Sequence, residues 1–476
     1  MNGPLRKVSI FVAIMFAALL VNATWMNVAR TDELNQHPMN RRVRDAEFAK
    51  YRGAILLGNE PLAVSTRTES QRFPWQRTYP DGRLWAPVTG WFSYEYGRSG
   101  LEASYAPELS GTSSALTITR AVDLLTGRQT SGASISTTLN PAAQRAGLDA
   151  LGSYRGAVVA MNYETGEILA LVSTPTYDPE ELSSLNLAEV RESWSALLNH
   201  PDEPLKNRAT REIYPPGSTF KLVVAAAALE DGALPSTPLD APTSFRLPNS
   251  SRSIGNSTNC GGTTVSLEQA LQTSCNTAFA GLGLELGQEK IRAMAEAFGF
   301  NQEQKIDIAA ATSGYPTEMD EAQTALSAIG QFDVTASPLQ MAQVAAAIAN
   351  DGVAMRPFLV NTVTNRDLTV VSSTRPERLS QPLTSTNAQL LQQMMESVVR
   401  DGTGKPARID DLTIGGKTGT AQSAPDRPPY AWFIGYAKEP KVAVAAFVEN
   451  ADVDRDDISG GRLAAPIFKA VVEALR

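Results

Sequence analysis

The chain has 476 residues, of which 43% are hydrophobic and 19% are charged, and its formal net charge at pH 7 is -8. This composition is typical of a globular protein, and it excludes a chain that is disordered or membrane-embedded throughout. The length predicts two folded domains and a short additional segment. No nucleic-acid partner is expected, because the chain is acidic and no long run of Lys and Arg provides a cationic patch for phosphates.

The N-terminus carries the pattern of an export signal. Two basic residues, Arg6 and Lys7, precede an apolar run at 8–21 that continues more weakly for about two further turns. A helix of this length crosses a hydrocarbon layer of about 30 Å, so we expect residues 1–28 to form a cytoplasmic tip and an uncleaved single-pass anchor. A cleaved signal peptide is the alternative. In both cases the positive-inside rule places the rest of the chain outside the cytoplasm.

The next segment, 29–139, is polar and rich in turns, with prolines scattered among short β-like runs such as 53–57. No motif within it carries recognisable chemistry. We therefore expect a non-catalytic pedestal domain that is irregular and rich in β-structure.

The remaining segment, 140–476, is expected to be the catalytic domain. Helical spacing over 139–151 leads into strand-like runs at 156–161 and 167–173, which a tight turn joins into a β-hairpin. Helical patterns dominate the middle, most clearly at 219–230. Strand-like runs return at 418–422, 432–436 and 442–449, before a final helix over 466–476. Strands at both ends with helices between them predict an α+β domain whose antiparallel sheet is completed when the chain returns.

The segment 214–221 reads YPPGSTFK, so a Pro/Gly breaker delivers Ser218 to the start of a helix, three residues before Lys221. This spacing places both side chains on one helix face, as a nucleophile and its base require. Lys221 can accept the serine proton only if desolvation or a nearby cation lowers its pKa. Alone, the S-x-x-K spacing is more often a capping serine followed by a surface lysine.

Two further segments place polar groups close together. Ser274 and Asn276 are separated by one residue in a short turn between helical stretches. By itself, such a pair is more often a helix cap. The segment 415–422 reads GGKTGTAQ, in which Lys417 and two threonines lie on a strand whose glycines let another chain approach closely. A cation and hydroxyls along such an edge form a receptor for a carboxylate and an extended peptide, although an ordinary hairpin strand has the same pattern.

Together the three segments match, in order, the S-x-x-K, S-x-N and K-T-G motifs of β-lactamases and penicillin-binding proteins. The wider sequence resembles the class B penicillin-binding transpeptidases, and within that family the actinobacterial penicillin-binding protein A group. The resemblance rests on segments at 156–159, 165–170, 177–179, 207–208, 328–331 and 350–352. In the pedestal, 52–55 and 100–102 resemble the family more weakly, whereas 58–61 (GNEP) departs from its usual Asp-Arg-Asn-Gly.

The resemblance implies a serine-transpeptidase/β-lactamase-like fold, with an antiparallel sheet and a helical cluster. It implies a peptidoglycan D,D-transpeptidase that is acylated by β-lactams, uses no cofactor or metal, and has D,D-carboxypeptidase hydrolysis as a side reaction. The implied partners are peptidoglycan stem peptides or their lipid-linked precursor, a membrane glycan polymerase, and other proteins of cell-wall elongation or division.

The resemblance also assigns catalytic roles. Ser218 would attack the penultimate D-Ala carbonyl, Lys221 would be the base, and Ser274 would relay a proton to the leaving amine. Asn276 would orient Lys221 and bind the substrate amide, and Lys417 would keep the site electropositive.

The same resemblance assigns substrate binding to Thr418, Gly419 and Thr420. The two threonines would hold the substrate carboxylate. Backbone N–H groups of Ser218 and Thr420 would form the oxyanion hole, a contribution of several kcal/mol in acyl transfer.

Four other functions fit the sequence less well. A bifunctional glycan polymerase would need a large additional domain before residue 139, and the segment there is too short and has no evident acidic site. A Ser-His-Asp hydrolase is disfavoured, because the chain has only two histidines and no G-x-S-x-G elbow. A β-lactamase needs a deacylation base, and Glu181 precedes Ser218 with the wrong spacing, so we interpret it as a solvated surface charge. A membrane-tethered β-lactam-binding sensor or scaffold remains the alternative from another class, although all three motifs are intact.

The only two cysteines, Cys260 and Cys275, are expected to form a disulfide. Both lie outside the cytoplasm in the predicted topology, where disulfides persist, and no other cysteine competes for either. If Ser274 and Asn276 face the cleft, the Cys275 side chain should point toward the protein body. Two buried thiols are the alternative, because sequence does not establish the required separation.

Overall fold

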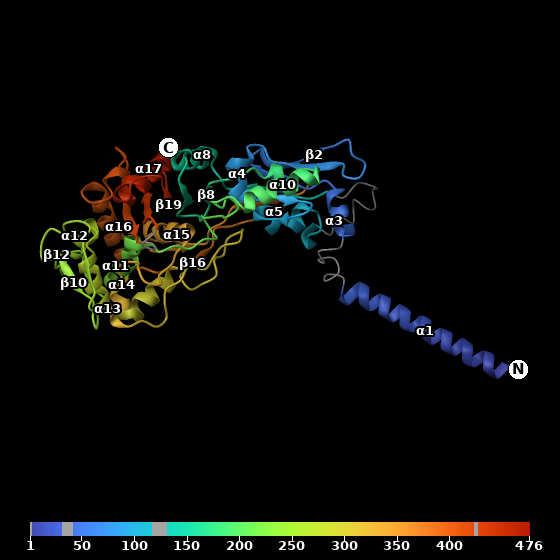
Figure 1. Ribbon diagram of the computed structural model, residues 1–476, viewed down its shortest axis with the longest axis horizontal. Coiled ribbons are helices and arrows are strands. Elements are labelled where there is room, and N and C mark those ends of the chain that lie inside the picture. Colours follow the sequence, from blue (N-terminus) through green and yellow to red (C-terminus); the bar gives the residue numbers. More distant parts are fainter. Residues whose placement is uncertain (1, 31–40, 117–130, 423–426) are drawn as a thin grey trace. The chain divides into compact units, whose positions relative to one another are not determined.

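The structure, a computed structural model, describes residues 2–30, 41–116, 131–422 and 427–476 (Figure 1). By its internal contacts the chain forms two compact units. One comprises Met1–Tyr51 and Ser65–Gln76, and the other comprises Arg52–Val64 and Arg77–Arg476.

The smaller unit contains the N-terminal helix α1 (Asn2–Ala29). Its stretch Gly3–Met26 has a mean hydropathy of 2.1, and α1 is the one helix among the described residues that is long and apolar enough to cross a membrane. It fits the expected single-pass anchor, although a signal sequence would have the same length and composition. After α3 (Arg41–Phe48), Phe48 packs edge-on against Phe73.

The pedestal elements are short, as the turn-rich sequence predicted. They are β1 (Ile55–Leu57), β2 (Glu60–Arg67), β3 (Trp75–Thr78), α4 (Gly82–Thr89), β4 (Phe92–Ser93), β5 (Gly97–Arg98), α5 (Gly100–Ser104), α6 (Ala106–Leu109) and β6 (Ser134–Thr137). β1 pairs antiparallel with β2 and parallel with β6.

A hairpin from far along the chain extends this sheet. β14 (Val360–Thr364) pairs antiparallel with β6 and with β15 (Val370–Ser373), which gives a six-stranded sheet of order β15-β14-β6-β1-β2-β3. Residues 360–373 lie within the segment expected to form the catalytic domain, yet they complete the pedestal sheet. This pairing covers the edge of β6, which would otherwise expose its backbone groups.

A buried ion cluster lies inside the pedestal. Nε atoms of Arg52 and Arg77 each lie 2.6 Å from a carboxylate oxygen of Glu102, and the three side chains are almost fully buried. Burial alone would raise the pKa of Glu102, but Arg77 and Arg52 outweigh it and hold that pKa below its ordinary value. Removing one partner would leave a buried charge without compensation.

The catalytic sheet has five strands in the order β17-β18-β19-β7-β8, and every neighbouring pair is antiparallel. The strands are β7 (Arg155–Asn162), β8 (Ile168–Thr174), β17 (Ile414–Ala421), β18 (Tyr430–Ala437) and β19 (Val442–Asn450). The expected hairpin is therefore present as β7 and β8, and the late strands complete the sheet by pairing β19 with β7. This confirms the predicted α+β fold.

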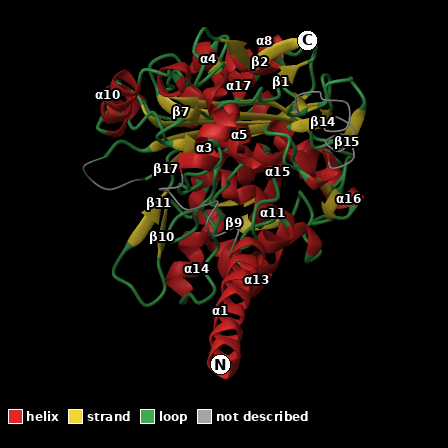
Figure 2. Cartoon of the chain, turned by 90° about the vertical axis from the view of Figure 1, so that its right-hand side faces the viewer, coloured by secondary structure: helices red, strands yellow, loops and turns green. Residues whose placement is uncertain are grey.

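Helices cover both faces of this sheet, so its strands are buried on both sides. Alternate residues such as Val158 face α8 (Pro141–Leu151) and α17 (Ala465–Ala474), and their neighbours such as Val159 face α15 (Pro338–Ala349). Figure 1 shows α8 and α17 side by side, and Figure 2 places α17 and α15 on opposite sides of the strands.

The other helices and small strands lie between the two halves of the sheet in the sequence. The helices are α9 (Glu180–Ser183), α10 (Leu187–Leu198), α11 (Lys221–Glu230), α12 (Leu267–Gln272), α13 (Asn276–Ala297), α14 (Glu321–Ser327) and α16 (Ser385–Arg400). The small strands are β9 (Pro238–Asp240), β10 (Ser244–Arg246), β11 (Ser253–Gly255), β12 (Thr264–Ser266), β13 (Ala354–Met355) and β16 (Arg378–Ser380).

Candidate active site

Ser218 lies in a short 3-10 turn, Gly217–Phe220, and Lys221 is the first residue of α11. The helix thus begins slightly later than the sequence indicated. Gly217 has φ of 53°, and a Cβ there would lie 3.0 Å from the backbone oxygen of Thr420. Its N–H donates to the Gly330 carbonyl at 3.0 Å. Only glycine therefore lets the Ser218 turn pack closely against β17.

The residues before the turn are held from both sides. Tyr214 exchanges two backbone hydrogen bonds with Ala336, of 2.9 and 2.8 Å. The indole Nε1 of Trp432 on β18 donates to the Pro215 carbonyl at 3.0 Å, and the Trp432 side chain is fully buried. No local sequence pattern indicates this role of Trp432, because its partner is a backbone atom that lies far away in the sequence.

The ammonium group of Lys221 is fully buried and faces the S-x-N turn. It donates to the Ser274 carbonyl at 2.7 Å and to Asn276 Oδ1 at 2.8 Å, and its Nζ lies 3.3 Å from Ser274 Oγ. Burial, and then the nearby charge of Lys417, hold the pKa of Lys221 well below its ordinary value. The condition that the sequence set for a lysine base is therefore met.

Lys417 approaches the same serine from the sheet. Its Nζ donates to Ser274 Oγ at 2.9 Å and to the Thr418 carbonyl at 2.9 Å. Burial lowers the pKa of Lys417 to about 7. Ser274 itself has φ of 60°, which is rare for a residue other than glycine. This unfavourable backbone conformation directs its hydroxyl to both lysines.

Substrate-binding candidates line β17, which forms one edge of the catalytic sheet. Thr420 is exposed, whereas Thr418 is largely buried and its hydroxyl lies 2.7 Å from that of Thr403. A Cβ on Gly419 would lie 3.0 Å from the Pro216 carbonyl, so glycine is required where the Ser218 turn meets the strand. No local sequence pattern indicates this contact of Thr403.

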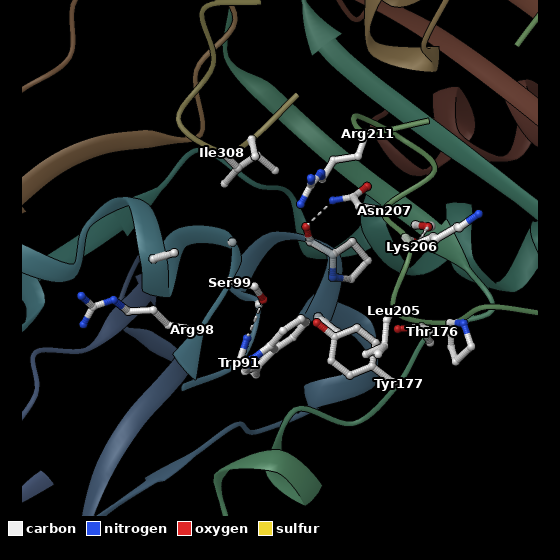
Figure 3. A pocket seen from close by; sticks show the side chains of 18 of the residues that line it. Trp91, Arg98, Ser99, Thr176, Tyr177, Leu205, Lys206, Asn207, Arg211 and Ile308 are labelled. Atoms are coloured by element: carbon white, nitrogen blue, oxygen red, sulfur yellow. Dashed lines mark hydrogen bonds between the residues drawn. The ribbon is translucent and has the colours of Figure 1, made fainter. Parts of the chain in front are cut away.

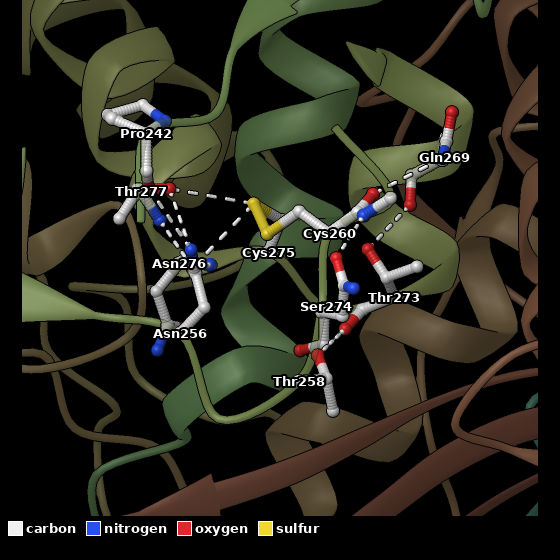
Figure 4. Close-up of a disulfide and its surroundings, with 12 residues drawn as sticks. Pro242, Asn256, Thr258, Cys260, Gln269, Thr273, Ser274, Cys275, Asn276 and Thr277 are labelled. Atoms are coloured by element: carbon white, nitrogen blue, oxygen red, sulfur yellow. Dashed lines mark hydrogen bonds between the residues drawn. A yellow bond between two sulfur atoms is a disulfide. The ribbon is translucent and has the colours of Figure 1, made fainter. Parts of the chain in front are cut away.

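The disulfide prediction is confirmed. Cys260 and Cys275 are bonded, their Cα atoms are 5.3 Å apart, and Cys275 is fully buried (Figure 4). The Cys275 side chain thus points into the protein body, as expected for a residue between Ser274 and Asn276. Glu181 is exposed, which agrees with its interpretation as a surface charge.

A separate cavity of about 230 Å³ lies where α4 and α5 of the pedestal meet the segment 204–211 (Figure 3). None of the predicted catalytic residues lines it. Asn207 uses its amide to bind the Pro87 carbonyl at 2.8 Å, and the hydroxyl of Ser99 accepts from the Trp91 N–H at 3.2 Å. These lining groups are therefore paired within the protein. No group of three or more His, Cys, Asp or Glu side chains suited to a metal occurs in the described ranges.

Two known family models match the chain. The family model described as the penicillin-binding protein transpeptidase domain matches residues 156–473, which include all three motifs. The chain belongs to the class B penicillin-binding transpeptidases. A second family model, the penicillin-binding protein A dimerisation domain, matches residues 52–135 of this penicillin-binding protein.

Individual relatives of this penicillin-binding protein match along its whole length. It is 42% identical to peptidoglycan D,D-transpeptidase PbpA of Mycolicibacterium smegmatis, over 100% of the chain and 99% of that protein. It is 41% identical to the PbpA of Mycobacterium tuberculosis over the same shares.

Solved structures give the same result. The ceftriaxone acyl-enzyme complex of M. tuberculosis penicillin-binding protein A has a TM-score of 0.86 and 40% identity, and covers 90% of this chain and 99% of that one. The penicillin G acyl-enzyme complex has a TM-score of 0.84 at 40% identity, with 89% and 99% covered.

Proposed function

We propose that this chain is a peptidoglycan D,D-transpeptidase that cross-links stem peptides through an acyl-enzyme on Ser218, and that β-lactams acylate the same serine. One observation carries the proposal: Ser274 Oγ lies within 3.3 Å of Lys221 Nζ and within 2.9 Å of Lys417 Nζ. Three motifs far apart in the sequence thus meet around one hydroxyl. The names of the full-length relatives and the acyl-enzyme structures of related proteins support the same chemistry.

Acylation begins with proton transfer. Lys221, whose lowered pKa favours its neutral form, takes the proton of Ser218 as the serine oxygen attacks the penultimate D-Ala carbonyl. The bond to the terminal D-Ala nitrogen then breaks, and Ser274 relays a proton to that leaving amine. Asn276 holds Lys221 through Oδ1, and one of its two amide hydrogens goes to the Gly255 carbonyl at 3.0 Å. The other amide hydrogen is assigned to the substrate.

The developing oxyanion is assigned to the N–H groups of Ser218 and Thr420, because the Ser218 turn packs directly on this part of β17. Such preorganised donors stabilise acyl-transfer transition states by several kcal/mol. Thr420, Thr418 and the charge of Lys417 are assigned to the substrate carboxylate. Gly419 lets the strand edge approach the extended peptide.

An amine from a neighbouring stem peptide resolves the acyl-enzyme and forms the cross-link, without a cofactor or metal. A β-lactam instead leaves its amine tethered to the acyl group, so the adduct is released only when water hydrolyses the ester. Glu181, the carboxylate considered as a deacylation base, is exposed to solvent. The adduct should be long-lived, because no residue after Ser218 in the sequence presents the glutamate arrangement that would activate a hydrolytic water.

The proposed location is the cell membrane, with α1 as a single-pass anchor, the N-terminus in the cytoplasm and the catalytic domain outside. The distribution of Arg6 and Lys7 before the apolar run supports this orientation. We assign the pedestal to 29–139 and the catalytic domain to 140–476, apart from the hairpin at 360–373 that joins the pedestal sheet. The proposed partners are stem peptides or their lipid-linked precursor, a glycan polymerase and other wall-synthesis proteins, with no nucleic acid.

The test uses the full-length chain in detergent. Penicillin should add one acyl group to Ser218, as located by intact-protein and peptide mass spectrometry, and a D-Ala-D-Ala thioester analogue should be turned over. Labelling without turnover of the analogue would favour a β-lactam sensor. Rapid hydrolysis of penicillin would favour a β-lactamase.

A further inference from the structure

The turn that carries Ser274 and Asn276 is held by a loop from another part of the chain. α13 begins at Asn276, and its N-cap residue, Cys275, makes no side-chain cap because its sulfur is in the disulfide. The first N–H groups of a helix have no partner within the helix. Here Asn256, which follows β11, supplies the acceptor.

Asn256 binds the helix start with both ends of its amide (Figure 4). Its Oδ1 accepts from the N–H groups of Asn276 at 2.7 Å and Thr277 at 3.0 Å. Its Nδ2 donates to Thr277 Oγ1 at 3.0 Å and lies 3.3 Å from the Pro242 carbonyl. These contacts determine which way the amide faces, so the oxygen is always directed to the helix.

The same loop also fixes the side chain of Asn276. Asn276 Nδ2 donates to the Gly255 carbonyl at 3.0 Å, which directs Oδ1 toward Lys221 Nζ, 2.8 Å away. The loop thus controls both the backbone and the amide orientation of the residue that binds the proposed base. Nothing in the local pattern of the S-x-N motif specifies this orientation.

We propose that Asn256 is a positioning residue for acyl transfer, which acts through Asn276 on Lys221. The inference rests on the proposed function of this site. The hydrogen bonds described for Asn256 go to Asn276, Thr277 and Pro242, so it acts on the site through the S-x-N turn. Its effect is to keep the Ser274–Asn276 turn against the buried ammonium group.

The unfavourable backbone of Ser274 explains why such a restraint is needed. A residue other than glycine with φ of 60° keeps that conformation only when its surroundings impose it. Without the Asn256 oxygen, two N–H groups lose their acceptor and the turn relaxes away from Lys221. Water then reaches the ammonium group. Lys417 is the charged group whose field acts on Lys221 among the described residues, and it remains in place.

The measurement is the second-order rate constant for acylation of the full-length chain in detergent by a fluorescent penicillin, as a function of pH. Asn256→Ala should lower the rate about tenfold. It should also move the acid limb of the profile to higher pH, because a better solvated Lys221 binds its proton more tightly. Complete labelling at long times would show that the variant is folded.

Two variants make the assignment specific. Asn256→Asp keeps the acceptor for the helix, so its rate at the maximum of the pH profile should be within about twofold of wild type. Asn259→Ala makes the same change in the same loop, where the side chain accepts from the Gly261 N–H, and it should behave as wild type.

An Asn256→Ala protein with the wild-type rate and pH profile would overturn the proposal. The proposal would also be overturned if Asn256→Ala lowered only the fraction of protein that is labelled, since that result indicates a purely structural role. An equal loss in Asn259→Ala would assign the effect to the loop in general. Absence of labelling in wild type would instead contradict the proposed function.

Discussion

The ammonium group of Lys417 donates a hydrogen bond to the hydroxyl of Ser274 at 2.9 Å, although the two residues are 143 positions apart. The same hydroxyl lies 3.3 Å from Nζ of Lys221. One small side chain therefore connects two buried lysines. In the proposed mechanism this lets a proton pass from the base toward the leaving amine while Lys417 fixes the hydroxyl oxygen.

Ser218→Ala should abolish covalent penicillin labelling and leave the fold intact. The change removes one hydroxyl from a small, half-buried side chain, so we expect a stability change of less than about 1 kcal/mol. Intact-protein mass spectrometry and thermal unfolding measure the two effects. A stable acyl adduct on the variant would contradict the assignment of the nucleophile.

Acylation should have a bell-shaped pH profile. The rate rises with pH as Lys221 loses its proton and becomes a base, and it falls as Lys417, with a pKa of about 7, loses the charge that binds the substrate carboxylate. Lys417→Ala should be slower throughout and should lack the alkaline limb. The acylation rate constant across pH tests this, and an unchanged alkaline limb in Lys417→Ala would assign that titration to another group.

The buried charge of Lys417 should lower the unfolding free energy of the chain by an amount that depends on pH. Its pKa is about 7 in the folded chain, compared with about 10.4 in an unfolded one. The unfolded state therefore binds more protons between these values, so stability rises with pH over that range and the penalty is complete below it.

Lys417→Met removes this penalty and should raise the unfolding free energy by about 1 to 2 kcal/mol at pH 6, with the gain disappearing above about pH 10. Thermal unfolding at the two pH values measures it. A gain of equal size at both would mean that better packing, and not the buried charge, is the cause.

Reduction of the disulfide should slow acylation before it unfolds the protein. The bond joins residues 15 positions apart, and closing a loop of this length contributes about 3 kcal/mol in the chain-entropy model. Because Cys275 lies between Ser274 and Asn276, the freed turn moves first. Acylation rates and circular dichroism during titration with a reductant compare the two events, which would coincide if the bond were only a global restraint.

Trp432→Phe should slow acylation markedly and lower the unfolding free energy only a little. The change removes the donor to the Pro215 carbonyl, at a cost of about 1 kcal/mol in stability, and lets the Ser218 turn move. We expect an acylation rate about tenfold lower. Trp91→Phe is a matched control, because its indole N–H binds a backbone carbonyl, that of Tyr96, in the pedestal. Equal losses in both variants would contradict a local effect on the turn.

Local patterns were sufficient for much of the fold. The hairpin of β7 and β8, the α11 helix and the late strands all follow from short-range periodicity and turn residues, which the chain expresses wherever it folds. The three motifs were recognisable because each places its functional residues within four positions of one another. The cysteine pair was predictable because no other partner exists in the sequence.

Short-range patterns did not predict contacts between segments that lie far apart in the sequence. The sequence of the β14 and β15 hairpin does not distinguish it from other short strand pairs. Its place in the pedestal sheet depends on pairing with the edge of β6. Likewise, Asn256, Thr403 and Trp432 act through backbone atoms or a hydroxyl that lie far from them in the chain or in a different loop. Their residue types alone do not indicate these hydrogen bonds.

By itself, the sequence determined which residues of this penicillin-binding transpeptidase we propose as the nucleophile, the base and the cation, because their chemistry needs particular side chains at short spacings. Only the tertiary structure decided that Lys221 and Lys417 are both buried and share Ser274. The lowering of both pKa values arises from desolvation and from the distance between two charges, and these quantities exist only once the helices have packed against β17.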